Sequence, residues 1–199
     1  LLVSVSDDAI SSVISQIQIP TKGIIAHTSG SVSMDVFKNK FENCGVFYPL
    51  QTFSKEKKLS IHKVPFCIEG AKSFVTDTLK NLALKISPLV YDISSEQRKT
   101  LHVGAIFACN FVNHLLALSK EVLTNKSLDF NILKPLIEET IEKALSIEHP
   151  KDVQTGPAIR KDIKTIEKHL NYLDYDSSKQ KIYQLLTESI MNFYADKSE

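Results

Sequence analysis

The sequence of 199 residues lacks the features that mark several classes of protein. Its longest unbroken apolar run is a handful of residues, far fewer than a membrane-spanning helix needs. The first residues do not have the basic and then apolar layout of a signal peptide. Lys and Arg together number 24 against 23 acidic residues, so the chain has no basic excess for binding a nucleic-acid backbone. We therefore expect neither a membrane nor a nucleic acid as partner.

Cysteine is scarce as well, since Cys44, Cys67 and Cys109 are the only three. They are odd in number and widely spaced, which matches no zinc site, and we expect no metal. The pattern is typical of reduced, largely buried thiols in a cytoplasmic protein. Hydrophobic residues make up 43% of the chain, enough to exclude a disordered protein and to predict a soluble globular one.

Short β-like runs alternate with helical patterns over residues 1–94. The predicted strands cover residues 1–6, 23–27, 45–48, 64–69 and 89–93. The first helix ends at Pro20, and the charged run at residues 55–58 indicates a solvated loop. Strands that alternate with helices predict an α/β domain with a mainly parallel sheet.

After residue 94 the pattern becomes helical throughout. Ser94 and Gln97 form a predicted capping box for a helix over residues 95–124. Three more helices are predicted: one near residues 130–147, one that begins at Pro157, and one at the C-terminus. The sequence thus predicts two domains, an α/β domain at 1–94 and an all-helical domain at 95–199.

The predicted helix over residues 95–124 is apolar on nearly all sides. Such a helix must be buried on most of its surface. The three helices that follow it are too few to cover it, so we expect a second copy of the chain to supply the remaining cover. The sequence therefore predicts a homodimer built through the helical domain.

Polar side chains interrupt this apolar helix at His102, Asn110 and Asn113. A buried Asn without a hydrogen-bond partner costs about 1–3 kcal/mol, so each must have a partner. In one interpretation the Asn residues bond to neighbouring backbone or across a dimer interface. In the other, Asn110 and His102 face a cleft between the domains and contact a substrate, with Asn113 beside them.

Small polar residues follow the predicted strand that ends at His27, namely Thr28, Ser29 and Gly30. Ligands bind open α/β sheets at the carboxyl ends of parallel strands, and a Gly lets the backbone come close to a cofactor. An ordinary turn favours the same residue types, so the pattern alone leaves both interpretations open.

The segment from Thr155 to Arg160 is predicted to open a helix at Pro157. Free N–H groups at a helix start, with a guanidinium one turn later, could hold a carboxylate or a phosphate. A plain helix start with a solvated Arg explains the same residues equally well. The sequence contains neither a G-x-G-x-x-G turn nor a P-loop.

Taken together, several short strings of the sequence resemble one known family. The strings are Val3–Ile10 (VSVSDDAI), His27–Gly30 (HTSG), Tyr48–Phe53 (YPLQTF), Ala108–Phe111 (ACNF) and Thr155–Arg160 (TGPAIR). The family comprises Rossmann-like oxidoreductases with a helical C-terminal domain of unknown function, related to pyrroline-5-carboxylate reductase and the 6-phosphogluconate dehydrogenase superfamily. The resemblance implies a partial Rossmann-type sheet, NADP or NAD on the α/β domain, a substrate in the cleft between domains, and a dimer.

This sequence departs from the family pattern in three places. The family begins with a strand and a Gly-rich phosphate loop that this sequence lacks, so we expect the gene to encode them upstream of Leu1. Ile106 stands where the hydroxyacid-dehydrogenase relatives have a catalytic Lys, and His102 is the nearest substitute acid. Tyr48 stands where many relatives have His, so a histidine role is not carried over to it.

We therefore predict an NAD(P)-dependent oxidoreductase that transfers a hydride to or from a small metabolite. Catalysis would depend on His102 and Asn110, and Asn113, Thr155 and Arg160 would contact the substrate. The alternative is a non-catalytic nucleotide-binding or sensory protein that retains the fold. The residues predicted to hold the cofactor are Val5, Ser6, Asp7, His27, Thr28, Ser29 and Gly30.

Overall fold

The computed structural model describes residues 1–18, 23–53 and 59–195, and it divides the chain into two compact units, Leu1–His114 and Leu115–Glu199. The predicted helix end at Pro20 and the predicted loop at 55–58 lie outside the described residues.

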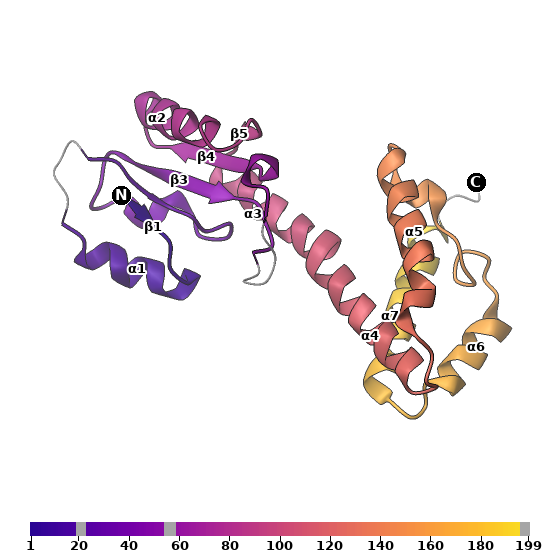
Figure 1. Ribbon diagram of the computed structural model, residues 1–199. Coiled ribbons are helices and arrows are strands. Elements are labelled where there is room, and N and C mark those ends of the chain that lie inside the picture. The colour runs from indigo at the N-terminus through magenta and orange to yellow at the C-terminus, as the bar shows by residue number, and fades with distance from the viewer. Residues whose placement is uncertain (19–22, 54–58, 196–199) are drawn as a thin grey trace. The chain divides into compact units, whose positions relative to one another are not determined.

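The first unit contains a five-stranded sheet whose strands follow their order in the chain (Figure 1). All neighbouring strands pair in parallel except β3 and β4, which are antiparallel. The predicted mainly parallel sheet is therefore confirmed, with one reversal. The strands are β1 (Leu2–Val3), β2 (Ile25–His27), β3 (Cys44–Pro49), β4 (Phe66–Gly70) and β5 (Val90–Asp92).

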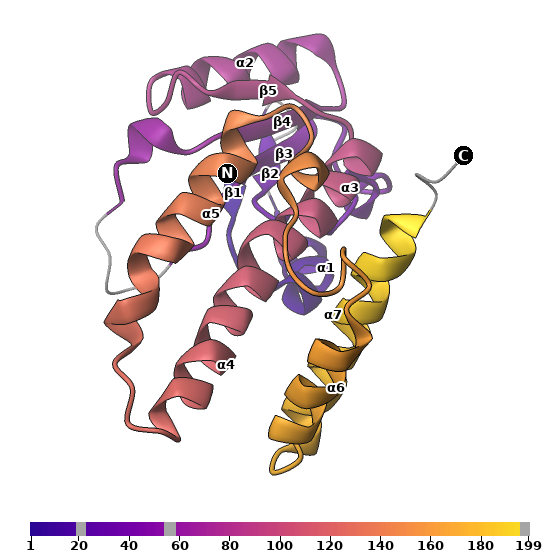
Figure 2. The same ribbon diagram turned by 90° about the vertical axis from the view of Figure 1, so that its right-hand side faces the viewer.

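Helices cover both faces of this sheet (Figures 1 and 2). On one face α1 (Asp7–Gln16) buries Ile10 and Ile14 against Phe37, which lies in the 3₁₀ helix η1 (Met34–Phe37). On the other face α2 (Ser73–Leu84) packs against β3 and β4. The core on that side also includes Ala26, Phe47, Val64, Phe66, Ile68, Val75, Leu79 and Ala83. A further 3₁₀ turn, η2 (Ile61–Lys63), precedes β4.

The long helix spans Ser95–Thr124, as predicted, and its first turn has the predicted Ser94–Gln97 capping box. It is not uniform, because the π-helical segment η3 (Ile106–Phe111) separates α3 (Ser95–Ala105) from α4 (Val112–Thr124). The single chain leaves this helix largely exposed, so the expectation that a second copy covers it stays a prediction. Its apolar side chains include several exposed ones, among them Phe107 at 65%.

This helix also bears on the expectation that the protein has no membrane partner, which rested on the shortness of the unbroken apolar runs. By length and composition alone Ser95–Thr124 could cross a membrane, because its polar residues are too few to offset the apolar ones. One such helix is weak evidence, since helices of soluble proteins pass the same test.

The second unit is helical, as predicted, over its described residues. The helix that was predicted to begin at Pro157, however, does not begin there. Lys161 has a positive φ of 54°, which ends the preceding turn, and Asp162 then caps a helix that starts at Ile163. The elements are η4 (Phe130–Leu133), α5 (Lys134–Ser146), η5 (Pro150–Val153), α6 (Ile163–Tyr172) and α7 (Ser177–Phe193).

The boundary between the compact units differs from the predicted domain boundary at residue 94. Residues 95–114 belong to the first unit, and an ion pair between Arg98 of α3 and Glu69 of β4 links this segment to the sheet. The compact units do not decide where the functional domains end. The functional domains at 1–94 and 95–199 therefore stay a prediction.

Candidate functional site

The ends of β1 and β2 bring several of the predicted cofactor residues together. The hydroxyl of Ser31 donates a hydrogen bond to the carboxylate of Asp7, and the Ser29 hydroxyl accepts from the backbone N–H groups of Ser31 and Val32 at 3.1 and 3.0 Å. Burial raises the pKa of Asp7, but the hydrogen bonds from Ser31 and Ser29 outweigh it and the net pKa lies below the ordinary value. Asp7 is therefore a carboxylate at neutral pH.

Three further predicted cofactor residues lie on the same strand ends. Val5 and Ser6 are exposed, and the backbone of Ser6 occupies the cap position of α1. Thr28 is partly buried in the turn that follows β2. These residues leave an accessible edge at the carboxyl ends of two parallel strands, where open α/β sheets bind ligands.

His27, in contrast, is fully buried and its ring stacks on Phe37 at a centroid distance of 5.6 Å. Its Nδ1 accepts a hydrogen bond from the Ser29 N–H at 3.2 Å. Burial, with a smaller contribution from the nearby Arg98 charge, lowers the pKa of His27 to about 4, so the ring is neutral at pH 7. The side chain supports the Ser29 turn, and because the whole residue is buried, the prediction that His27 contacts the cofactor is wrong for this structure.

Gly30 places this turn against two side chains that sequence reasoning did not pair. A Cβ at Gly30 would lie 2.6 Å from Cζ of Tyr48 and 2.8 Å from Nδ1 of His102. The Tyr48 hydroxyl and His102 Nδ1 are themselves 3.3 Å apart, within hydrogen-bond distance. Glycine fits position 30 because a Cβ there would displace at least one of these two side chains.

A cavity of about 350 Å³ opens beside the Tyr48–His102 pair, and residues of the first unit form all of its lining. His102 and Asn110 both line this cavity, and their contact with a substrate stays a prediction. Asn113 is exposed on α4 and is not in the lining. No Lys, Arg, Asp or Glu is among the described residues of the lining: Tyr48, Leu50, Gln51, Thr52, Phe53, His102, Ala105, Ile106, Cys109 and Asn110.

The prediction of buried thiols is correct for two cysteines and wrong for the third. Cys44 and Cys67 are buried, and burial raises the pKa of each thiol above its ordinary value. Cys109 is exposed, and it lies in the π-helical segment and lines the cavity.

Arg98 anchors the helix that carries His102. Its side chain is only 1% exposed, its Nη1 donates to the Glu69 carboxylate at 2.6 Å, and its Nη2 donates to the backbone oxygen of Val32 at 2.6 Å. Ser95 also donates to Glu69, through both its N–H and its hydroxyl. These bonds fix α3 to β4 and to the segment just after Gly30, so they hold His102 opposite Tyr48.

Sequence reasoning missed Tyr48 and Arg98, although each carried a signal. Tyr48 stands in the most distinctive string of the resemblance, at the end of a predicted strand. Arg98 is one helical turn before His102 and shares its face. Neither signal could show the partner, because Tyr48 and His102 are 54 residues apart.

The predicted anion site at Thr155 and Arg160 does not have the geometry that motivated it. Both residues are exposed and belong to the second unit, in the segment that precedes α6. The helix starts later, at Ile163, and the Asp162 carboxylate accepts from the Thr165 N–H at its N-terminus. A carboxylate already occupies the position that a bound anion would need.

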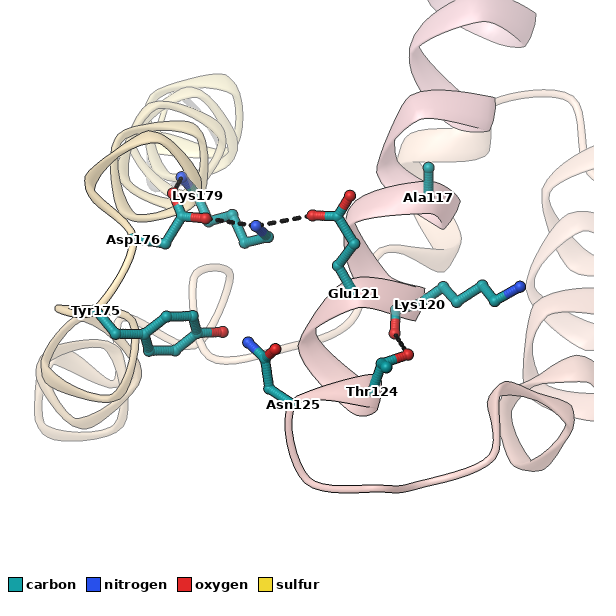
Figure 3. A pocket seen from close by; sticks show the side chains of 8 residues that line it. All are labelled: Ala117, Lys120, Glu121, Thr124, Asn125, Tyr175, Asp176 and Lys179. Carbon is teal, nitrogen blue, oxygen red and sulfur yellow. Dashed lines mark hydrogen bonds and ion pairs between the residues drawn. The ribbon is translucent and has the colours of Figure 1, made fainter.

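The second unit has its own cavity, of about 550 Å³, at the start of α7 (Figure 3). Lys179 lies between Asp176 and Glu121, and its ammonium is 2.9 Å from the Glu121 carboxylate. This cavity is the larger of the two, but three of its ionic groups, Lys179, Asp176 and Glu121, pair with one another. The smaller cavity is the better candidate for chemistry, because the Tyr48–His102 pair and Asn110 line it and the predicted cofactor turn packs on that pair.

The sheet, the covering helices and the helical C-terminal part define a Rossmann-like oxidoreductase fold. More particularly, the chain belongs to the family described as a domain of unknown function, DUF2520, whose model matches residues 64–190. No curated protein matches the chain.

Solved structures agree with this assignment. A protein from Bacteroides fragilis, described as a candidate NADP oxidoreductase, is 41% identical over 96% of this chain and 74% of its own, with a TM-score of 0.89. A protein from Thermotoga maritima is 22% identical over 100% of this chain and 79% of its own, with a TM-score of 0.75. An NADH-preferring ketol-acid reductoisomerase from an uncultured archaeon is 11% identical over 96% of this chain and 63% of its own, with a TM-score of 0.51. The last two likenesses concern the fold alone.

Proposed function

We propose that this protein is an NAD(P)-dependent oxidoreductase that acts on a small metabolite. The observation that carries the proposal is the contact at Gly30. The turn predicted to hold the cofactor packs directly on Tyr48 and His102, which line the cavity. A nicotinamide held along the strand ends and a substrate in the cavity would therefore be neighbours within the first unit. The description of the Bacteroides fragilis relative supports a nucleotide cofactor.

The residues at this edge fit one half of a dinucleotide. The Asp7 carboxylate can accept hydrogen bonds from ribose hydroxyls or a carboxamide, and the Ser29–Ser31 turn offers a close backbone approach. The same carboxylate would repel phosphates, and the sequence contains no Gly-rich loop to bind them. We therefore assign the nicotinamide and its ribose to this edge. When bound, the cofactor supplies or accepts the hydride.

The protein's own residues then supply orientation and a proton. The amide of Asn110 can hold a polar atom of the substrate, because an amide offers both a donor and an acceptor. The Tyr48–His102 pair can exchange a proton with the reacting group. Asn113, Thr155 and Arg160, which were predicted to contact the substrate, have no role in this proposal because none of them lines the cavity.

Two further predictions belong to this proposal. A homodimer through the helical part would cover the exposed apolar residues of the long helix, such as Phe107 and Phe111. We also place the protein in the cytoplasm, where reduced thiols such as the buried Cys44 and Cys67 are normal.

The rival function is a nucleotide-binding or sensory protein that does not catalyse a reaction. Ile106, at the position of the relatives' catalytic Lys, is the residue that favours it. Fold alone does not decide between the two.

The test combines binding and turnover. NADPH fluorescence is titrated with the protein, and the complex is then screened against small aldehydes, ketones and imines for oxidation of NADPH. We expect binding and turnover, and we expect Asn110→Ala to lower kcat/KM by about 10–100-fold through lost orientation. Asn81→Ala, an exposed substitution on α2, is the matched control. Binding without turnover on any substrate would establish the rival, and absence of binding would refute both.

A further inference from the structure

We infer that Tyr48 is the residue that gives its proton directly to the substrate, and that the substrate is an uncharged aldehyde or ketone whose oxygen receives this proton. This inference rests on the proposed function, because hydride from a reduced nicotinamide completes the reduction. It identifies the substrate class and decides between two neighbouring acids.

The hydrogen-bond arrangement favours Tyr48 over His102 as the donor. Its hydroxyl carries one hydrogen, so when it donates to a substrate it must accept its other bond from His102 Nδ1. The Gly30 backbone closes one side of the pair and holds the two groups together. His102 then stabilises the negative charge that develops on the phenol oxygen. Burial raises the pKa of Tyr48, which keeps the phenol protonated at neutral pH.

The lining of the cavity favours a neutral substrate. No Lys, Arg, Asp or Glu is among the described residues that line it, so these residues offer a charged iminium or carboxylate no opposite charge in place of its hydration. Leu50, Phe53 and Ile106 offer apolar surface for the carbon skeleton, while Asn110 and Gln51 offer hydrogen bonds. An aldehyde or ketone with an apolar substituent matches this combination.

The reaction balances with these groups. The carbonyl π bond breaks as its carbon forms a C–H bond with the hydride and its oxygen forms an O–H bond with the Tyr48 proton. The nicotinamide is oxidised and the carbonyl is reduced to an alcohol. Tyr48 then regains a proton through His102, which is reprotonated by water.

The first test needs neither cofactor nor turnover. Cyclohexanone labelled with ¹³C at the carbonyl serves as the probe, and its carbonyl resonance is followed by NMR as protein is added. We expect a downfield shift, because the carbonyl accepts a hydrogen bond, and we expect Tyr48→Phe to abolish the shift without unfolding the protein. Tyr91→Phe, on β5 and outside the cavity lining, is the control that should keep it. A shift that survives Tyr48→Phe but is lost in His102→Asn would overturn the inference.

The second test ranks the two acids during turnover. For ketone reduction we expect Tyr48→Phe to lower kcat by about 10²–10³-fold, with KM changed by less than about threefold. We expect His102→Asn to lower kcat by only about tenfold and to change its pH profile. The reverse order would make His102 the donor and overturn the inference.

The cation 1-pyrrolinium distinguishes the substrate class. If the wild-type protein reduces it faster than cyclohexanone, and Tyr48→Phe leaves that rate unchanged, the carbonyl assignment is wrong while the oxidoreductase function stands. If NADPH does not bind at all, the proposed function is wrong, and the carbonyl shift still decides whether Tyr48 donates to a neutral oxygen.

Discussion

The two compact units of this protein are stabilised in different ways. In the first unit, Val46, Ile68, Val75 and many other apolar side chains are fully buried on the two faces of the sheet. Among the described residues of the second unit, only three apolar side chains, Ala158, Ile166 and Leu173, are buried. The unit that carries the candidate site therefore holds its geometry with its own core, whereas the helical unit buries few apolar side chains.

The second unit leaves many large apolar side chains exposed to solvent. Leu145 is 81% exposed, and its other large exposed residues include Ile132, Leu136, Leu185 and Phe193. Contiguous exposed apolar surface is typical of a protein interface. The proposed homodimer would supply such cover, and the predictions below separate core stability from this cover.

The largest effect is expected at the buried ion pair of the first unit. Arg98→Met leaves the Glu69 carboxylate without its partner, and breaking a buried pair costs about 3–5 kcal/mol of the free energy of unfolding. Urea denaturation followed by circular dichroism measures it. Lys80→Met, which removes an exposed pair with Asp92, is the control and should cost less than about 1 kcal/mol. Equal costs for the two variants would show that the Arg98–Glu69 bond does not anchor α3.

A pair of apolar truncations compares the core of the sheet with the exposed helix. Ile68→Ala opens a cavity in the core and should cost about 2–5 kcal/mol at any protein concentration. Phe107→Ala removes a side chain that is exposed in the single chain, so it should matter only through association. We expect its effect to vanish on dilution. Sedimentation that shows a monomer for the wild-type protein at micromolar concentration would contradict the dimer.

Acid should weaken the first unit through His27. The folded protein holds the pKa of His27 at about 4, below the ordinary 6.5, so the unfolded chain binds a proton between these values that the folded protein does not. The free energy of unfolding therefore falls as the pH drops from about 6.5 to about 4, by at most about 3 kcal/mol from this group. His27→Gln should flatten that part of the pH profile. An unchanged profile would mean that His27 takes up its proton without cost.

The smallest effect is expected at the ionic group of the second unit. Lys179→Met removes the bridge between Asp176 and Glu121, which lie partly or largely exposed to water (Figure 3). Such pairs contribute about 1 kcal/mol or less, and salt should reduce the difference further. Thermal unfolding in low and high salt measures it. A cost as large as that of Arg98→Met would remove the contrast between the units.

The sequence pattern predicted the fold better than the site. Alternation of strands and helices is a local property, so residues 1–94 and the capping box at Ser94 were predictable. The start of α6 was not, because the left-handed backbone of Lys161 overrides the preference of Pro157 for a first helical turn. Pairing between distant residues is the least predictable feature, and Tyr48–His102 and Glu69–Arg98 are both of that kind.

The most direct test of the central claim is an NMR measurement of the NADPH complex of the whole protein. Nuclear Overhauser effects between the nicotinamide C4 proton and the ring protons of Tyr48 or His102 would place the reactive carbon beside the cavity. We predict that these effects appear and that Gly30→Leu abolishes them, because its side chain would occupy the space next to both rings. Bound NADPH whose nicotinamide shows no contact with either ring would contradict the account.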